Sequence, residues 1–149
     1  LPGWRVLEKY AVRAGGAFNH RMGLYDGVLI KDNHIAACGG ITAAVAAVRQ
    51  RISHLIRIEV ETENLAQVQE ALDAGAEVIM LDNMDDTDIA RAVDLIGSRA
   101  DIEVSGRIQG GRIRRLAELG VQIVSMGSLT YGAGFVDIHM EMALSDPGL

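Results

Sequence analysis

Short apolar runs alternate along the chain with longer segments in which apolar residues recur every three or four positions. Runs of this length are typical of buried strands, and the longer spacing is typical of helices that pack one face against a core. The pattern predicts strands at residues 28–31, 55–61, 77–81, 102–105 and 121–126. It predicts helices at residues 4–14, 41–52, 63–73, 87–96 and 112–119.

Glycines mark the ends of three predicted helices, at Gly75, Gly97 and Gly120, and glycine is a frequent helix stop. The order helix, glycine turn, strand recurs at residues 71–79 and 116–124, and this is the repeating unit of α/β folds. Because no hairpin signal separates the strands, we expect a parallel sheet. The pattern alone leaves two α/β architectures open, a doubly wound open sheet and a TIM-like barrel.

Charged residues occupy one face of the second predicted strand. Arg57, Glu59 and Glu61 alternate with apolar residues, and alternate residues of a strand point to the same side. Glu103 and Ser105 share a face of the fourth strand in the same way. Since unpaired buried charge is costly, one explanation is an edge strand with a solvated face. The other is a barrel whose polar mouth binds a ligand at the carboxyl ends of its strands.

The bulk composition limits the classes of function. The 149 residues are enough for one domain with a sizeable core, and no apolar run is long enough to span a membrane. No signal-peptide pattern opens the chain. The net charge of −6 argues against nucleic-acid binding but leaves room for a local cationic pocket. The single Cys38 cannot form an internal disulfide, which fits a reducing cytoplasm, and we expect it to be a small packed residue.

Polar residues gather at the ends of the predicted strands and in the loop before the first strand. Together they supply cations, carboxylates and two glycine-containing turns. A ligand that carries phosphates and carboxylates, bound with a divalent metal ion, would use all three. The residues are Asn19, His20, Arg21, Lys31, Glu61, Asp82, Ser105, Gly106, Arg107, Met126, Gly127 and Ser128.

Each of these groups has a functional and an ordinary interpretation. The turns at residues 105–107 and 126–128 could cradle phosphate with backbone N–H groups, or could be plain strand-to-helix turns. Glu61 and Asp82 could hold hydrated Mg2+, directly or through water, or could be solvated acids. Arginine and lysine suit carboxylate ligands, whereas His20 could equally be a surface histidine.

Two long motifs are specific. Residues 1–12 read LPGWRVLEKYAV, and residues 19–35 contain NHRMGLYD followed by LIKDNHI. Shorter segments follow in a fixed order: IEVE at 58–61, IMLDNM at 79–84, EVSG at 103–106 and GSLT at 127–130. In these segments the chain resembles the quinolinate phosphoribosyltransferase family (nicotinate-nucleotide pyrophosphorylase, carboxylating), and the resemblance covers essentially its whole length.

The resemblance implies an enzyme. Members transfer a phosphoribosyl group from phosphoribosyl pyrophosphate to quinolinate with decarboxylation, which gives nicotinate mononucleotide, pyrophosphate and CO2 in NAD biosynthesis. They use Mg2+ and work as homodimers. The implied fold is an open TIM-like barrel, here the C-terminal domain at residues 1–149. Because the chain begins with Leu1 rather than methionine, we expect the N-terminal domain and first barrel strand upstream.

The resemblance also implies roles for the gathered residues. His20, Arg21 and Lys31 would bind the carboxylates of quinolinate, and Lys31, Glu61 and Asp82 would be the catalytic residues, with Glu61 and Asp82 around the ribose and the magnesium pyrophosphate. The phosphate would be held by Ser105, Gly106, Arg107, Met126, Gly127 and Ser128. We expect this chain alone to be inactive, because the family's upstream T-R-K-T segment supplies a further substrate-binding arginine and lysine.

The chain departs from the family pattern at three places: residues 15–17 (GGA for a glycine triplet), Arg107 (for the last glycine of S-G-G) and residues 131–132 (YG for H-S). Arg107 could add a phosphate contact or block the turn. Two other hypotheses stay open. One is a related pyrophosphorylase group associated with molybdenum transport, and the other is a non-catalytic barrel that binds phosphorylated ligands or a partner.

Overall fold

The structure, a computed structural model, describes residues 2–142, so Leu1 of the N-terminal loop lies outside the described residues. Within them, five strands form one parallel sheet in the order β1-β2-β3-β4-β5. The strands are β1 (Val28–Ile30), β2 (Ile58–Thr62), β3 (Val78–Asp82), β4 (Asp101–Ser105) and β5 (Ile123–Val124). The helices are α1 (Arg5–Ala14), α2 (Asp32–Cys38), α3 (Ile41–Arg49), α4 (Leu65–Asp73), α5 (Asp86–Ile96), the 3-10 turn η1 (Gly110–Arg112), α6 (Ile113–Glu118) and α7 (Ser128–Tyr131).

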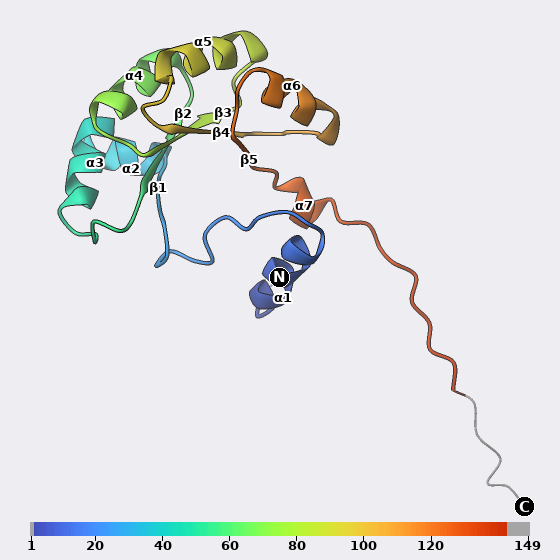
Figure 1. Cartoon of the computed structure of the whole chain (residues 1–149). Coiled ribbons are helices and arrows are strands. Elements are labelled where there is room, and N and C mark those ends of the chain that lie inside the picture. The colour runs from blue at the N-terminus through green and yellow to red at the C-terminus, as the bar shows by residue number, and fades with distance from the viewer. Residues whose placement is uncertain (1, 143–149) are drawn as a thin grey trace, which may run out of the picture.

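The helices lie unevenly on the two sides of the sheet. Helices α3, α4, α5 and α6 follow the outer side of a curved sheet, whereas α1 and the loop after it lie on the opposite side (Figure 1). The apolar core fills the space between the sheet and the outer helices. Residues Ile58, Val60, Ile79, Leu81 and Ile102 are fully buried there. Burial of one such side chain stabilises the fold by about 1.5–3 kcal/mol, so this layer fixes the sheet as a support for residues on its inner face.

The parallel α/β sheet predicted from the sequence is confirmed, but the edge explanation for the second strand is wrong. Strand β2 lies between β1 and β3, and Glu59 on it is only 7% exposed. The strand begins at Ile58 rather than at residue 55, because the Ile56 N–H donates to the Ser53 carbonyl (3.0 Å) in a turn. Both β1 and β5 pair with one neighbour each, so residues 2–142 form an open sheet.

Helix α2 is missing from the sequence-based prediction. Residues 31–34, expected as a strand end, instead start this helix. Lys31 is its N-cap, and the Lys31 N–H donates to Nδ1 of His34 (3.0 Å). Asp32 follows in the first turn, where a carboxylate suits the helix dipole. Cys38 ends the helix and is exposed, so the expectation that it packs inside is wrong.

None of the helices in the described part of the chain is both long enough and apolar enough to cross a membrane.

Candidate functional site

The inner face of the sheet carries its polar residues. In the parallel register Glu61 pairs with Met80, Met80 with Glu103, and Asp82 with Ser105. Paired residues of a parallel sheet point to the same side. The outer helices therefore cover the alternate, apolar residues, and the polar ones lie together on the inner face. This is the arrangement expected at the carboxyl ends of parallel strands, where ligands bind in α/β folds.

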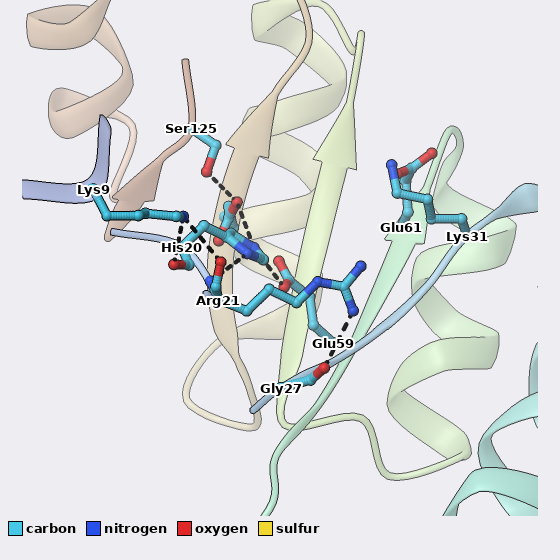
Figure 2. Close-up of polar contacts among 9 residues, drawn as sticks. Lys9, His20, Arg21, Gly27, Lys31, Glu59, Glu61 and Ser125 are labelled. Carbon is cyan, nitrogen blue, oxygen red and sulfur yellow. Dashed lines mark hydrogen bonds and ion pairs between the residues drawn. The ribbon is translucent and has the colours of Figure 1, made fainter. Parts of the chain in front are cut away.

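Lys31 and Glu61 form an ion pair at this end of the sheet. The Lys31 Nζ lies 3.1 Å from Oε2 of Glu61, and the carboxylate is the more buried partner, with 14% of its side chain exposed. The lysine comes from the start of α2 and the glutamate from β2. The structure thus joins two of the three predicted catalytic residues (Figure 2).

Asp82, the third predicted catalytic residue, ends β3 beside β2. Its Oδ2 accepts a hydrogen bond from Nδ2 of Asn83 (2.6 Å). The two carboxylates of Glu61 and Asp82 thus come from neighbouring strand ends on the same face. Oxygen donors of this kind, one or two per ion with water completing the shell, fit Mg2+.

The turn after β4 is shaped by backbone conformations that favour glycine. Gly106 has φ +92°, and a Cβ there would lie 2.5 Å from Oδ1 of Asn83, so a side chain cannot be accommodated. Arg107 has φ +50°, which is uncommon for a residue with a side chain. Its Nε donates to Oδ1 of Asn83 (3.4 Å). Arg107 therefore does not block the turn: it adopts the left-handed conformation, and its side chain contacts the end of the neighbouring strand.

The second predicted phosphate turn lies after β5. Gly127 is the N-cap of the one-turn helix α7, and Ser128 is its first residue. Gly127 has φ −63°, so its backbone is ordinary, but a Cβ would lie 3.0 Å from the Tyr131 ring. Met126 precedes this turn and packs partly against the core. The two turns therefore follow adjacent strands, as the sequence predicted.

His20 and Arg21 lie in the loop between α1 and β1. Lys9 of α1 donates from Nζ to the carbonyls of His20 (3.0 Å) and Arg21 (2.9 Å). The Arg21 Nη1 donates to the Gly27 carbonyl (3.2 Å). Asp26 accepts from the N–H of Met22 (2.7 Å) and of Gly23 (2.8 Å), and these two bonds lower the pKa of Asp26. Side chains rather than regular backbone bonding thus hold this loop in place.

Two buried carboxylates face His20, and the sequence analysis assigned no role to them. The His20 Nε2 lies 3.1 Å from Oε2 of Glu59 and 3.8 Å from Oε1 of Glu103 (Figure 2). Ser125 donates from Oγ to Glu103. In the described part of the chain, Oε1 of Glu59 is buried without a hydrogen-bond partner. The alternating charges of strand 58–62 were the available signal, but that pattern does not show which loop residue meets them.

This cluster shifts two pKa values. Burial raises the pKa of Glu103 to about 7, the nearby Glu59 carboxylate adds to the rise, and the Ser125 hydrogen bond opposes it. The hydrogen bond to Glu59 raises the pKa of His20, and partial burial opposes that rise. Near neutral pH the cluster therefore gains or loses protons readily, which is common where a site is arranged around ionisable groups.

Comparisons with known proteins agree on one family. Residues 1–141 match the profile described as "Quinolinate phosphoribosyl transferase, C-terminal domain". The chain is 47% identical over 145 residues to a "Probable nicotinate-nucleotide pyrophosphorylase [carboxylating]" of Bacillus subtilis, covering 97% of this chain and 50% of that protein. It is 39% identical over 159 residues to a mitochondrial "Quinolinate phosphoribosyltransferase [decarboxylating] 2a" of Nicotiana tabacum, covering 95% of this chain and 45% of the relative.

A solved structure of NadC from Streptococcus pyogenes has the same fold. It matches with a TM-score of 0.83 and 46% identity, and the match covers 89% of this chain and 46% of NadC. The chain thus spans about half the length of the relatives it matches.

Proposed function

Because the chain belongs to the quinolinate phosphoribosyltransferase C-terminal domain family, we propose that the protein containing it makes nicotinate mononucleotide. It transfers a phosphoribosyl group from phosphoribosyl pyrophosphate to quinolinate and releases pyrophosphate and CO2, as a pentosyltransferase of NAD biosynthesis. The names of the relatives, carboxylating or decarboxylating, support this reaction.

The observation that carries the proposal is the Lys31–Glu61 pair at the carboxyl end of the sheet, with Asp82 on the next strand. A cation and two carboxylates at neighbouring strand ends suit a reaction in which an anionic acceptor meets a ribose that becomes positively charged. The two turns after β4 and β5 add backbone N–H groups for a phosphate.

The acceptor carboxylates are the part of the substrate that needs cations. Lys31 and Arg21 would supply them, and an arginine guanidinium can hold a carboxylate through two parallel hydrogen bonds. We keep His20 in this group because it lies next to Arg21 and to the buried carboxylates. Lys31 lies 3.1 Å from Glu61, and on this proposal it would exchange that carboxylate for one of the substrate's.

Glu61 and Asp82 would take part in the step in which the ribose loses pyrophosphate. Loss of pyrophosphate leaves positive charge on the ribose, and fixed negative groups nearby stabilise it. Glu61 and Asp82 would act there. These two residues would hold Mg2+, directly or through water, and the ion would make pyrophosphate a better leaving group. Once the ring nitrogen is ribosylated, its positive charge accepts the electrons released by decarboxylation.

The phosphate of the donor would lie at the two glycine turns. Ser105, Gly106 and Arg107 would bind it from the end of β4, with the Arg107 guanidinium as a further cation. Met126, Gly127 and Ser128 would bind it from the end of β5. These six residues lie at the ends of adjacent strands, and in many barrels the phosphate site lies between the last strands.

We propose further that the sheet is part of an open TIM-like barrel completed by upstream residues. A pocket of about 500 Å³ lies along the edge strand β1, lined by Leu29, Ile30, Ala44 and Val48 among others. An additional strand and its neighbours would cover this apolar surface. A homodimer is also proposed, as the family resemblance implies. The cytoplasm remains the predicted compartment.

The proposal is tested with the longer protein that contains this chain. Purified protein is given quinolinate, phosphoribosyl pyrophosphate and Mg2+, and pyrophosphate release is followed. Release that depends on all three supports the proposal, and the isolated 149-residue chain should be inactive. If the phosphoribosyl donor protects the protein thermally and quinolinate does not, the reaction belongs to a different acceptor and the proposal is wrong.

A further inference from the structure

The loop at residues 15–27 contains no helix or strand and yet carries two of the proposed substrate-binding residues. On the α1 side, Lys9 donates to the carbonyls of His20 and Arg21. On the sheet side, His20 lies 3.1 Å from the Glu59 carboxylate. Ordering a short irregular segment costs conformational entropy, and this segment has few backbone hydrogen bonds of its own to offset that free-energy cost. The side-chain contacts therefore determine where the segment lies.

Both nitrogens of the His20 ring make a polar contact. Its Nδ1 accepts the Arg21 backbone N–H (2.9 Å), and its Nε2 meets the buried Oε2 of Glu59. A nitrogen that accepts a hydrogen bond carries no proton, so the neutral ring has its proton on Nε2 and donates it to Glu59. The ring therefore connects the sheet to the Arg21 main chain.

A bound metal ion is the competing explanation for this cluster. Ligand atoms of His20, Glu59 and Glu103 lie within 4.8 Å of one another, and one imidazole with two carboxylates suits several divalent metals. However, a metal at Nε2 requires the ring proton on Nδ1, and a proton there would end the hydrogen bond from the Arg21 N–H. The hydrogen-bond pattern therefore favours a proton rather than a metal between His20 and Glu59.

We propose that Glu59 is a positioning residue that acts through His20: its carboxylate sets the tautomer and orientation of the ring, and the ring fixes the Arg21 backbone so that its guanidinium meets the carboxylates of the acceptor. This proposal rests on the proposed function above. A carboxylate suits the role because it offers only acceptors to Nε2–H, whereas an amide can turn and offer donors. Glu103 lies farther from the same nitrogen, at 3.8 Å, which is beyond hydrogen-bond distance.

The kinetic test uses the longer protein that contains this chain. Glu59→Ala should raise the KM for quinolinate about tenfold, with kcat and the KM for the phosphoribosyl donor within about twofold of the unaltered protein. Glu59→Gln keeps an acceptor and should stay within about threefold. It also keeps the side-chain volume if Glu59→Ala fails to fold. An effect on kcat alone, or equal effects on both substrates, would overturn the proposal.

A double-mutant cycle tests whether Glu59 acts through His20. Glu59→Ala in a protein that already carries His20→Ala should have little further effect on the quinolinate KM, because the connecting ring is gone. Independent, additive effects would contradict the proposal. The matched control is Glu77→Gln. Glu77 also accepts a backbone N–H, from Ile58 (2.8 Å), but it precedes β3 at the opposite end of the sheet, so its loss should leave the quinolinate KM unchanged.

Imidazole ¹⁵N NMR separates failure of this proposal from failure of the proposed function. At a pH above the raised pKa of His20, the unaltered protein should show His20 with its proton on Nε2, and Glu59→Ala should give a mixture of tautomers. A proton on Nδ1, or a signal that moves on adding a divalent metal, would overturn the proposal whatever the protein catalyses. If the tautomer result holds and quinolinate is not a substrate, the proposed function fails while the connection between Glu59 and His20 stands.

Discussion

Glu103→Gln tests the electrostatics of the inner face most directly. The Glu103 carboxyl is 3% exposed, and burial raises its pKa from 4.5 to about 7. The folded protein therefore binds a proton more tightly than the unfolded chain does. The contribution of Glu103 to stability is full below pH 4.5, falls as the pH rises towards 7, and levels off above that value. A shift of about 2.5 units corresponds to about 3 kcal/mol of stability lost between those limits.

Glutamine mimics the protonated acid and does not titrate. It can accept from the Ser125 hydroxyl and donate to Glu59. The variant should match the unaltered protein within about 1 kcal/mol at pH 5, and should exceed it by up to about 3 kcal/mol at pH 8. The pKa of His20 is raised first by its hydrogen bond to Glu59, which both proteins keep, and also by the Glu103 charge, which the variant lacks.

Urea unfolding at pH 5, 6, 7 and 8 measures the difference. Glu77→Gln is a control of opposite sign. The pKa of Glu77 is lowered, through Arg49 and the Ile58 N–H and against a burial effect, so its contribution is present above its unfolded pKa and is lost only as the pH falls through its folded value. That control should be less stable by the same amount from pH 6 to 8. A Glu103→Gln difference that is constant with pH would refute the reasoning.

Three further outcomes follow from the site. In the longer protein, Lys31→Ala and Arg21→Ala should each weaken quinolinate binding by about 2–4 kcal/mol; steady-state kinetics measure this, and an unchanged KM and kcat in both variants would reject the assignment. Gly106→Ala should destabilise the protein by at least about 1 kcal/mol, because of its positive φ and the 2.5 Å approach to Asn83; an unchanged melting temperature would be inconsistent with the turn described here. Arg107→Gly should stabilise the protein by up to about 1 kcal/mol by relieving the left-handed backbone while raising the KM for the phosphoribosyl donor; a KM that stays the same would remove Arg107 from the phosphate site.

Much of the fold can be predicted because it depends on local pattern. Strand 78–82 is a largely apolar run and strand 101–105 alternates polar and apolar residues; both lie between glycine-ended helices and form where the periodicity indicates, within one residue at most ends. Helix α2 is missed because its first turn is polar and its N-terminal hydrogen bond, from Lys31 N–H to His34 Nδ1, depends on a side chain. Cys38 is misjudged because its exposure depends on how that helix lies against the edge strand.

The site is predictable in part for the same reason. Lys31, Glu61 and Asp82 lie at the carboxyl ends of strands, and parallel strands bring these ends together without further information. The contact of His20 with Glu59 is different, because residues 20 and 59 are 39 apart in sequence and meet through an irregular loop. Periodicity shows that Glu59 shares a face with Glu61, but only the three-dimensional structure shows which side chain it meets.

The central claim is tested most directly by the product balance of the longer protein that contains this chain. With quinolinate, phosphoribosyl pyrophosphate and Mg2+, we predict that nicotinate mononucleotide, pyrophosphate and CO2 appear in equal amounts, and that none appears when quinolinate is left out. Consumption of the phosphoribosyl donor without CO2, or pyrophosphate release that does not depend on quinolinate, would contradict the account.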